Sequence, residues 1–155
     1  MENSGSALPR RLVMLYGAAI LISLIGLGDA IFLTVHHLSG RNVRCAISTG
    51  CDSVLASPYA TIGSIPIAVL GALAYFTVFS LATLATYGYE RARFLLSLVV
   101  LLMLISTLWL FYLQAFVLRA FCDYCLLSAA MTLGLSIVVV LGWKEESSRK
   151  KREVH

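Results

Sequence analysis

The sequence predicts an all-α membrane protein: a bundle of four transmembrane helices, with a long outer loop between the first and second helices. Of the 155 residues, 59% are apolar and only 13% are charged. A soluble globular domain is only about half apolar. The mean hydropathy is +0.88, and four separate stretches are long and apolar enough to cross a bilayer, which takes about 20 residues. We therefore expect a chain embedded in lipid.

The four predicted spans are Leu12 to Leu38, Pro66 to Tyr87, Phe94 to Leu118 and Cys122 to Trp143. The first follows Arg10 and Arg11, as in a signal peptide. Its apolar run is long for a signal peptide and no cleavage site clearly follows, so we expect a retained anchor. Pro66 suits the first position of the second helix, because a missing N–H costs nothing there.

The basic residues indicate the orientation. With a cytoplasmic N-terminus, nine of the 12 Lys and Arg residues lie in cytoplasmic segments, and only Arg41, Arg44 and Arg119 lie outside. This asymmetry follows the positive-inside rule. We expect residues 1–11 and the charged tail 144–155 to be cytoplasmic, on either side of a membrane domain at 12–143, and the tail to be solvated and partly disordered. Basic residues gathered at the chain ends do not indicate a nucleic-acid partner.

The outer loop, at about residues 39–64, is the one long stretch without a helical pattern, and loops of this length are usually functional. Within it, Cys51 to Ser57 is expected to form a short helix that Pro58 ends. Val54 and Leu55 of this helix would either lie on the membrane surface or cap the bundle.

All four cysteines are expected on the outer side. Cys122 and Cys125 form a Cys-x-x-Cys at the predicted start of the fourth span, where unpaired N–H groups and the helix dipole favour a thiolate and an easily cycled disulfide. Cys45 and Cys51 are separated by five residues, including Gly50, a spacing that can close a small loop disulfide. The two pairs predict a thiol–disulfide relay.

Two alternatives remain open for the cysteines. They could staple the outer loop of a non-enzymatic membrane scaffold, although a bridge closed within four residues constrains an unfolded chain very little. They could also form a structural zinc site, although such sites usually have close-spaced ligand pairs on a soluble knuckle. We expect no metal site.

The sequence resembles the vitamin K epoxide reductase family, in particular its bacterial branch without a fused thioredoxin-like domain. The resemblance rests on Cys51 to Ser57, Gly63, Pro66, Gly71, Tyr75, Phe121 to Leu126 and Ser128. The other family of four-span, quinone-linked disulfide oxidases has its Cys-x-x-Cys in the first outer loop and its wide pair in the second. The reversed order here favours the vitamin K epoxide reductase family.

The resemblance implies a quinone-dependent thiol–disulfide oxidoreductase of the bacterial inner membrane, with its active site on the periplasmic side. Electrons would pass from Cys45 and Cys51 to Cys122 and Cys125, and then to ubiquinone or menaquinone. Cys45 would meet a thioredoxin-like partner, Cys51 would exchange with Cys122, and Cys125 would lie nearest the quinone as a thiolate. Nothing after Trp143 could fold into a thioredoxin-like domain, so we expect the partner to be a separate chain.

The resemblance also places Ser57 near the quinone. Helical spacing adds Phe76, Phe116 and Phe121 as candidates for contact with the quinone ring, because ligand pockets are mostly apolar.

The animal enzymes of the family carry an asparagine and a tyrosine where this chain has Ile67 and Ala129. The polar groups that grip the vitamin's oxygens are therefore missing. Reduction of vitamin K epoxide, or of a quinone for its own sake, is the enzymatic alternative that this departure disfavours.

Four further polar residues stand out. Asp29 is the one acid near the membrane interior, where charge is costly. Because it lies near the outer end of the first span, it would either simply reach the interface or have a function, as a residue that orients the outer loop or as a proton route to the quinone. His36 and His37 would either relay protons or lie solvated at the interface. Gln114 would form a hydrogen bond either across helices, which is the more common use, or to a ligand.

Overall fold

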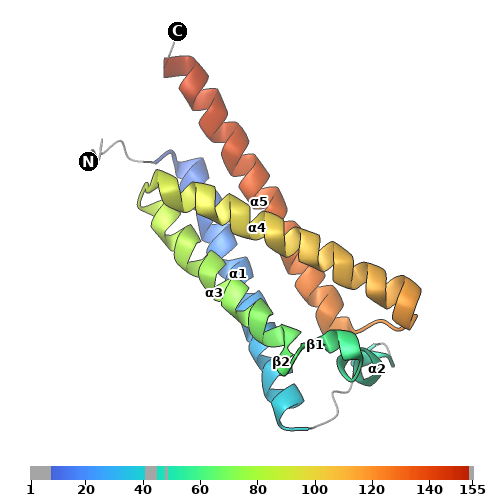
Figure 1. Cartoon of the computed structure of the whole chain (residues 1–155). Coiled ribbons are helices and arrows are strands. Elements are labelled where there is room, and N and C mark those ends of the chain that lie inside the picture. The colour runs from blue at the N-terminus through green and yellow to red at the C-terminus, as the bar shows by residue number, and fades with distance from the viewer. Residues whose placement is uncertain (1–7, 41–44, 48, 154–155) are drawn as a thin grey trace.

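The computed structural model describes residues 8–40, 45–47 and 49–153, so Arg41 and Arg44 lie outside the described residues. Its long helices are α1 (Arg10–Leu38), α3 (Ile67–Thr86), α4 (Glu90–Tyr112) and α5 (Asp123–Glu153). These four helices, α4 together with the turn that follows it, are long and apolar enough to cross a membrane. The predicted four-helix bundle is confirmed (Figure 1).

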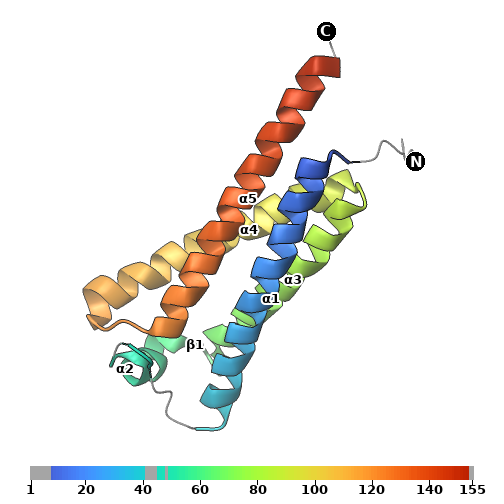
Figure 2. The same ribbon diagram turned by 180° about the vertical axis from the view of Figure 1, so that it is seen from behind.

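The helices form a ring in which each has two neighbours. On one side α1 packs between α3 and α5, and on the other α4 packs against the same two helices. Figures 1 and 2 show α4 crossing the bundle obliquely, so that its C-terminal end stands away from α3. Both chain ends lie at one end of the bundle, and the segment between α1 and α3 lies at the other.

Small residues bring the helices close together. Ala19, Ala82 and Ala85 are fully buried, as is usual where transmembrane helices meet. At Gly26 of α1, a Cβ atom would overlap the ring of Tyr75 from α3. Large apolar side chains remain exposed on all four helices, and lipid would cover them.

The outer loop contains α2 (Cys51–Leu55), a 3-10 turn η1 (Pro58–Ala60) and the strands β1 (Thr61–Ile62) and β2 (Ile65–Pro66). The predicted short helix is therefore present, although it ends before Ser57. Val54 is buried in a cluster with Leu33 of α1, so this helix caps the bundle.

The hairpin is a feature that the sequence pattern did not predict. Thr61 pairs with Pro66, and Gly63 supplies the turn with a φ of +64°, a conformation that glycine adopts without strain. Pro66 has an extended backbone and precedes α3, so its expected place as the first helical residue is wrong by one position.

The end of the third span departs from a regular α-helix. The π-helical turn η2 (Leu113–Leu118) follows α4, and Arg119 then adopts a left-handed conformation with a φ of 49°. The Ala120 N–H donates to the Gln114 carbonyl over 3.2 Å, which closes the turn. π-helical turns are often found at functional sites, and this one leads directly into the Cys-x-x-Cys.

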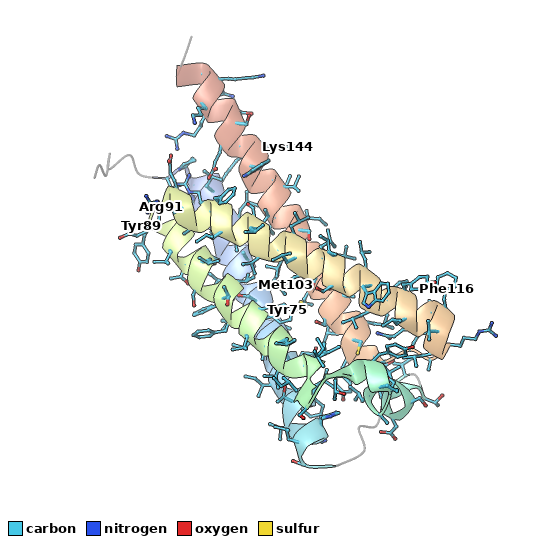
Figure 3. All side chains as sticks on the ribbon, in the orientation of Figure 1. Tyr75, Tyr89, Arg91, Met103, Phe116 and Lys144 are labelled. Carbon is cyan, nitrogen blue, oxygen red and sulfur yellow. A yellow bond between two sulfur atoms is a disulfide. The ribbon has the colours of Figure 1, made fainter. Side chains whose placement is uncertain are left out.

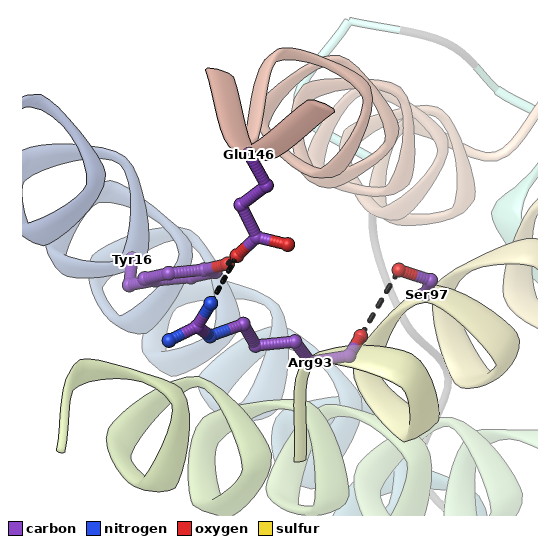
Figure 4. A network of polar contacts seen from close by, with 4 residues as sticks. All are labelled: Tyr16, Arg93, Ser97 and Glu146. Atoms are coloured by element: carbon purple, nitrogen blue, oxygen red, sulfur yellow. Dashed lines mark hydrogen bonds and ion pairs between the residues drawn. The ribbon is translucent and has the colours of Figure 1, made fainter. Parts of the chain in front are cut away.

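The charged tail continues α5 without a break to Glu153, so the expected partial disorder is wrong for residues 144–153. Glu, Lys and Arg are good helix formers. In addition, Glu145 pairs with Arg11 at 3.3 Å and Glu146 pairs with Arg93 at 2.7 Å. Figure 4 shows that Tyr16, whose hydroxyl donates to Glu146 over 3.0 Å, completes a network joining α1, α4 and α5.

Candidate active site

The Cys-x-x-Cys lies where the chain enters α5. Cys122 immediately precedes the helix and is fully buried, whereas Cys125 lies in its first turn and is partly exposed. The Cys122 N–H donates to the side-chain oxygen of Gln114 over 3.2 Å. Gln114 therefore holds the turn between the third and fourth spans through both its backbone carbonyl and its side-chain amide.

The two thiols of this pair differ. The Cys125 thiol donates a hydrogen bond to the Cys122 sulfur, and this bond is the main reason why the pKa of Cys122 is lowered to about 7. Burial opposes the shift, and the N–H groups of Cys125 and Tyr124 add to it. The resemblance implied a thiolate at Cys125, whereas the hydrogen bond between the two thiols lowers the pKa of Cys122.

Cys45 and Cys51 form a disulfide with their Cα atoms 5.6 Å apart, as their spacing allowed. Cys51 is the first residue of α2 and is 1% exposed. It belongs to one buried cluster with Cys122, and Cys45 and Cys125 pack against this cluster. The fold thus gathers all four cysteine side chains at one end of the bundle.

Two contacts hold the Cys45–Cys51 pair, here called the loop pair, against the start of α5. The backbone of Gly50 lies so close to Phe121 that a Cβ atom would come within 2.6 Å of the Phe121 carbonyl oxygen and 3.1 Å of the Ala120 Cβ. In addition, the Ile47 N–H donates to Asp123 Oδ2 over 2.6 Å. Both contacts lie next to a cysteine, so they set the position of one pair relative to the other.

A cavity of about 830 Å³ opens beside the cysteines, and most of its wall is apolar. Its size and lining are typical of a site for a small organic ligand. Residues of α1, α2, η1, the hairpin, α3, α4, η2 and α5 all contribute to the wall. Cys125 is part of the wall. A molecule in the cavity would therefore face the second sulfur of the Cys-x-x-Cys.

This arrangement agrees with a comparison against known families. The model of the vitamin K epoxide reductase family matches residues 18–140, a range that includes parts of all four long helices and every cysteine. The chain belongs to the vitamin K epoxide reductase family. Members of this family are membrane thiol–disulfide and quinone oxidoreductases, so an oxidoreductase with a redox-type cysteine site is the function class of this chain.

The structure brings only some of the predicted quinone contacts together. Ser57 and Cys125 both line the cavity, and the Ser57 hydroxyl donates to the Val54 carbonyl over 2.7 Å. Phe76, Phe116 and Phe121 are 55%, 69% and 41% exposed and are not among the residues of the cavity wall. Figure 3 shows Phe116 near the C-terminal end of α4. Helical spacing selected these rings as candidates but could not indicate which face of each helix is turned inward.

The two family positions that differ in this chain do lie on the cavity wall. Ile67 and Ala129 line it, so the asparagine and tyrosine of the animal enzymes would project toward this cavity. Here both positions are apolar. The cavity wall therefore lacks the polar groups that the animal enzymes carry at these positions.

A tyrosine to which the sequence assigned no role also lies on this wall. The Tyr75 hydroxyl donates to the Ser128 carbonyl over 2.9 Å and lies 3.3 Å from the Thr132 hydroxyl. This network joins α3 to α5 within the two helical turns that follow Cys125. Tyr75 and Ser128 were recognised only as family residues, because hydrogen bonding between spans is not visible in a hydropathy pattern.

Proposed function

We propose that this protein is a quinone-dependent disulfide-forming oxidoreductase. The observation that carries the proposal is the apolar cavity, which has Cys125 on its wall. Cys122 of the same pair belongs to the buried cluster that contains Cys51 of the outer loop. A membrane quinone is an apolar ring with two polar oxygens, and it fits a site of this lining and size. The quinone would be the electron-accepting substrate, either ubiquinone or menaquinone.

Electrons would enter at the loop pair. A thiolate of a reduced thioredoxin-like protein attacks the Cys45 sulfur, the Cys45–Cys51 bond breaks, and a second partner thiol releases the partner as a disulfide. Cys51 then attacks Cys122 in an oxidised Cys122–Cys125 pair, and Cys45 closes the loop disulfide again. Cys122 and Cys125 are left reduced. The arrangement with the Cys45–Cys51 pair (the loop pair) bonded and the Cys122–Cys125 pair (the helix pair) free is compatible with this last step.

The helix pair would pass its two electrons to the quinone. Cys125 supports this role because it faces the cavity, while Cys122, whose pKa is lowered to about 7, is available as a thiolate to close the disulfide. The products are a Cys122–Cys125 disulfide and a quinol.

The same proposal includes the location. We place the cysteines on the periplasmic side of the bacterial inner membrane and both termini in the cytoplasm, in agreement with the excess of Lys and Arg in the segments at the terminal end. The thioredoxin-like partner would be a separate periplasmic chain.

Three alternatives are less well supported. Reduction of vitamin K epoxide would have to proceed with Ile67 and Ala129 on the cavity wall in place of the polar pair. A scaffold with a stapled loop gives no reason for a second cysteine pair against an apolar cavity. A zinc site would need sulfurs that the Cys45–Cys51 disulfide already occupies. Among the described residues no group of three or more His, Cys, Asp or Glu side chains is placed to hold a metal ion.

The test is anaerobic oxidation of the reduced protein by a short-chain ubiquinone or menaquinone, in lipid nanodiscs. We expect two thiols to be lost for each quinol formed, and we expect no quinol from Cys122→Ser or Cys125→Ser. Cys45→Ser is the matched control, because it should still reduce quinone when a small dithiol supplies the electrons but should no longer oxidise thioredoxin. If the wild-type thiols stay reduced with both quinones, the proposal is wrong.

A further inference from the structure

Asp29 has an unusual position in α1. It lies about 13 Å before the outer end of the helix, at 1.5 Å per residue, and it is 9% exposed. Neither carboxylate oxygen has a hydrogen-bond partner. The side chain lines the same cavity as Cys125. A polar group this deep in a transmembrane helix is usually retained for function.

The surroundings of Asp29 offer it no compensating charge. Among the described residues, no lysine or arginine lines the cavity, and the other titratable groups on its wall are His37 of α1, Tyr59 of η1, Tyr75 of α3 and Cys125 of α5. An ionised carboxylate without a partner is strongly disfavoured in such surroundings. The neutral carboxylic acid is therefore the form that this cavity accommodates, and that form is a hydrogen-bond and proton donor.

The polar groups at the family positions on the wall are already engaged or absent. Tyr75 is bound to Ser128 and Thr132, and Ile67 and Ala129 provide no polar atom at the family positions. Of the buried side chains in the described part that have an unpartnered polar atom, only Asp29 lines the cavity. Quinone reduction needs a proton at each carbonyl oxygen as electrons arrive. This requirement gives the unpartnered acid a role.

We propose that Asp29 is a catalytic acid that donates its proton to a quinone carbonyl oxygen and recovers a proton from the Cys125 thiol. The proposal rests on the proposed function and names the proton route of the same site. It assigns to Asp29, in place of the asparagine and tyrosine found in the animal enzymes, the polar contact with the quinone oxygen.

The step balances. The Cys122 thiolate has already lost its proton to water, and Cys125 still carries its own. As the Cys122–Cys125 bond forms, the two sulfurs give up two electrons, Asp29 protonates one quinone oxygen, and the Cys125 proton passes to the Asp29 carboxylate. The second quinone oxygen takes its proton from water, which replaces the one that Cys122 released. Asp29 ends as the neutral acid, ready for another turnover.

The test compares wild-type protein with Asp29→Asn and Asp29→Glu in nanodiscs, with Glu90→Gln as the matched control. Glu90 is exposed at the start of α4, far along the chain from the cysteines. We expect Asp29→Asn to slow quinol formation roughly 10²-fold, the usual contribution of a general acid, and to abolish its solvent isotope effect. Asp29→Glu should restore most of the rate, and Glu90→Gln should match wild type. Reduction of the Cys45–Cys51 disulfide by thioredoxin should be the same in all four proteins.

A second readout needs no quinone. Infrared difference spectra of wild type against Asp29→Asn, at neutral pH and without quinone, should show the carbonyl stretch of a neutral carboxylic acid. A carboxylate signal in its place would overturn the proposal. So would a wild-type rate in Asp29→Asn, or an equal loss of quinol formation and of loop disulfide reduction, which would mark a structural role. If wild-type protein itself reduces no quinone, the proposed function fails and the role of Asp29 fails with it.

Discussion

At the scale of single residues, the two cysteines of the Cys-x-x-Cys differ although they share one turn of chain. Cys122 is fully buried just before α5, accepts a hydrogen bond from the Cys125 thiol, and donates its N–H to Gln114. Cys125 faces the cavity. This division suits a pair in which one sulfur faces the loop disulfide and the other faces an apolar substrate.

We expect the Cys122 thiolate to form as the pH rises through about 7, well below the usual value for cysteine, which is about 8.5. Below that pH the thiol predominates and closure of the disulfide should slow. Because the main cause is the Cys125 hydrogen bond, Cys125→Ala should move the titration to higher pH, whereas Cys125→Ser keeps a donor and should move it less. The measurement is ultraviolet absorbance of the thiolate against pH, with the loop cysteines held in their disulfide. Identical curves for wild type and Cys125→Ala would show that this hydrogen bond has no such effect.

At the scale of elements, the position of α2 depends on how closely the loop approaches the turn before α5. Gly50 precedes the helix and has an ordinary φ of −93°, so its backbone conformation does not require glycine. The close contact with the Phe121 backbone does. A single methyl group added at Gly50 would therefore displace the loop pair from Cys122 and Cys125.

Gly50→Ala should slow thiol exchange between Cys51 and Cys122 about ten- to 100-fold, because misplacement of reacting atoms by about 1 Å has effects of this order. The measurement is the yield of the Cys51–Cys122 disulfide in protein that also carries Cys45→Ala and Cys125→Ala, read by mass spectrometry of a non-reducing digest. Gly28→Ala in α1 is the control, since a Cβ atom there meets nothing within 4 Å. Equal yields in the two variants would show that Gly50 does not position the loop.

At the scale of the whole molecule, the cysteine site and a network of charged side chains lie at opposite ends of the bundle. The cysteines and the cavity opening beside them lie at the end occupied by α2 and the hairpin. The chain ends and the network of Tyr16, Arg93 and Glu146 lie at the opposite end (Figures 1 and 4). A bilayer between the two ends would confine all thiol exchange to one compartment.

The proposed sidedness predicts how added cysteines react in intact bacterial spheroplasts. Ser64→Cys at the hairpin tip should react with a membrane-impermeant maleimide from outside, because Ser64 is exposed at the cysteine end. Ser147→Cys, exposed on the tail of α5, should react only after the membrane is permeabilised. Wild-type protein sets the background from the native cysteines. The reverse pattern would invert the orientation and exclude a periplasmic partner.

Much of the fold could be predicted from the sequence, because hydropathy along the chain reflects the lipid environment directly. The four long helices begin within four residues of the predicted spans, and α1 and α3 also end within one residue of them. The loop disulfide agrees with the spacing of Cys45 and Cys51. The tail was the main error in the fold. Its charges suggested disorder, but Arg11, Arg93 and Tyr16, all distant in sequence, hold it as helix.

The sequence by itself determined that this chain crosses a membrane four times and carries two cysteine pairs of the vitamin K epoxide reductase family pattern. These properties depend on composition and local spacing. Only the tertiary structure decided which side chains face the cavity: Asp29, Ser57 and Tyr75 do, whereas Phe76, Phe116 and Phe121 do not. The physical reason is that a helix surrounded by lipid is apolar on every face. Its inward side is therefore set by packing against the other helices, through close contacts such as that between Gly26 and Tyr75, and not by the pattern of its own residues.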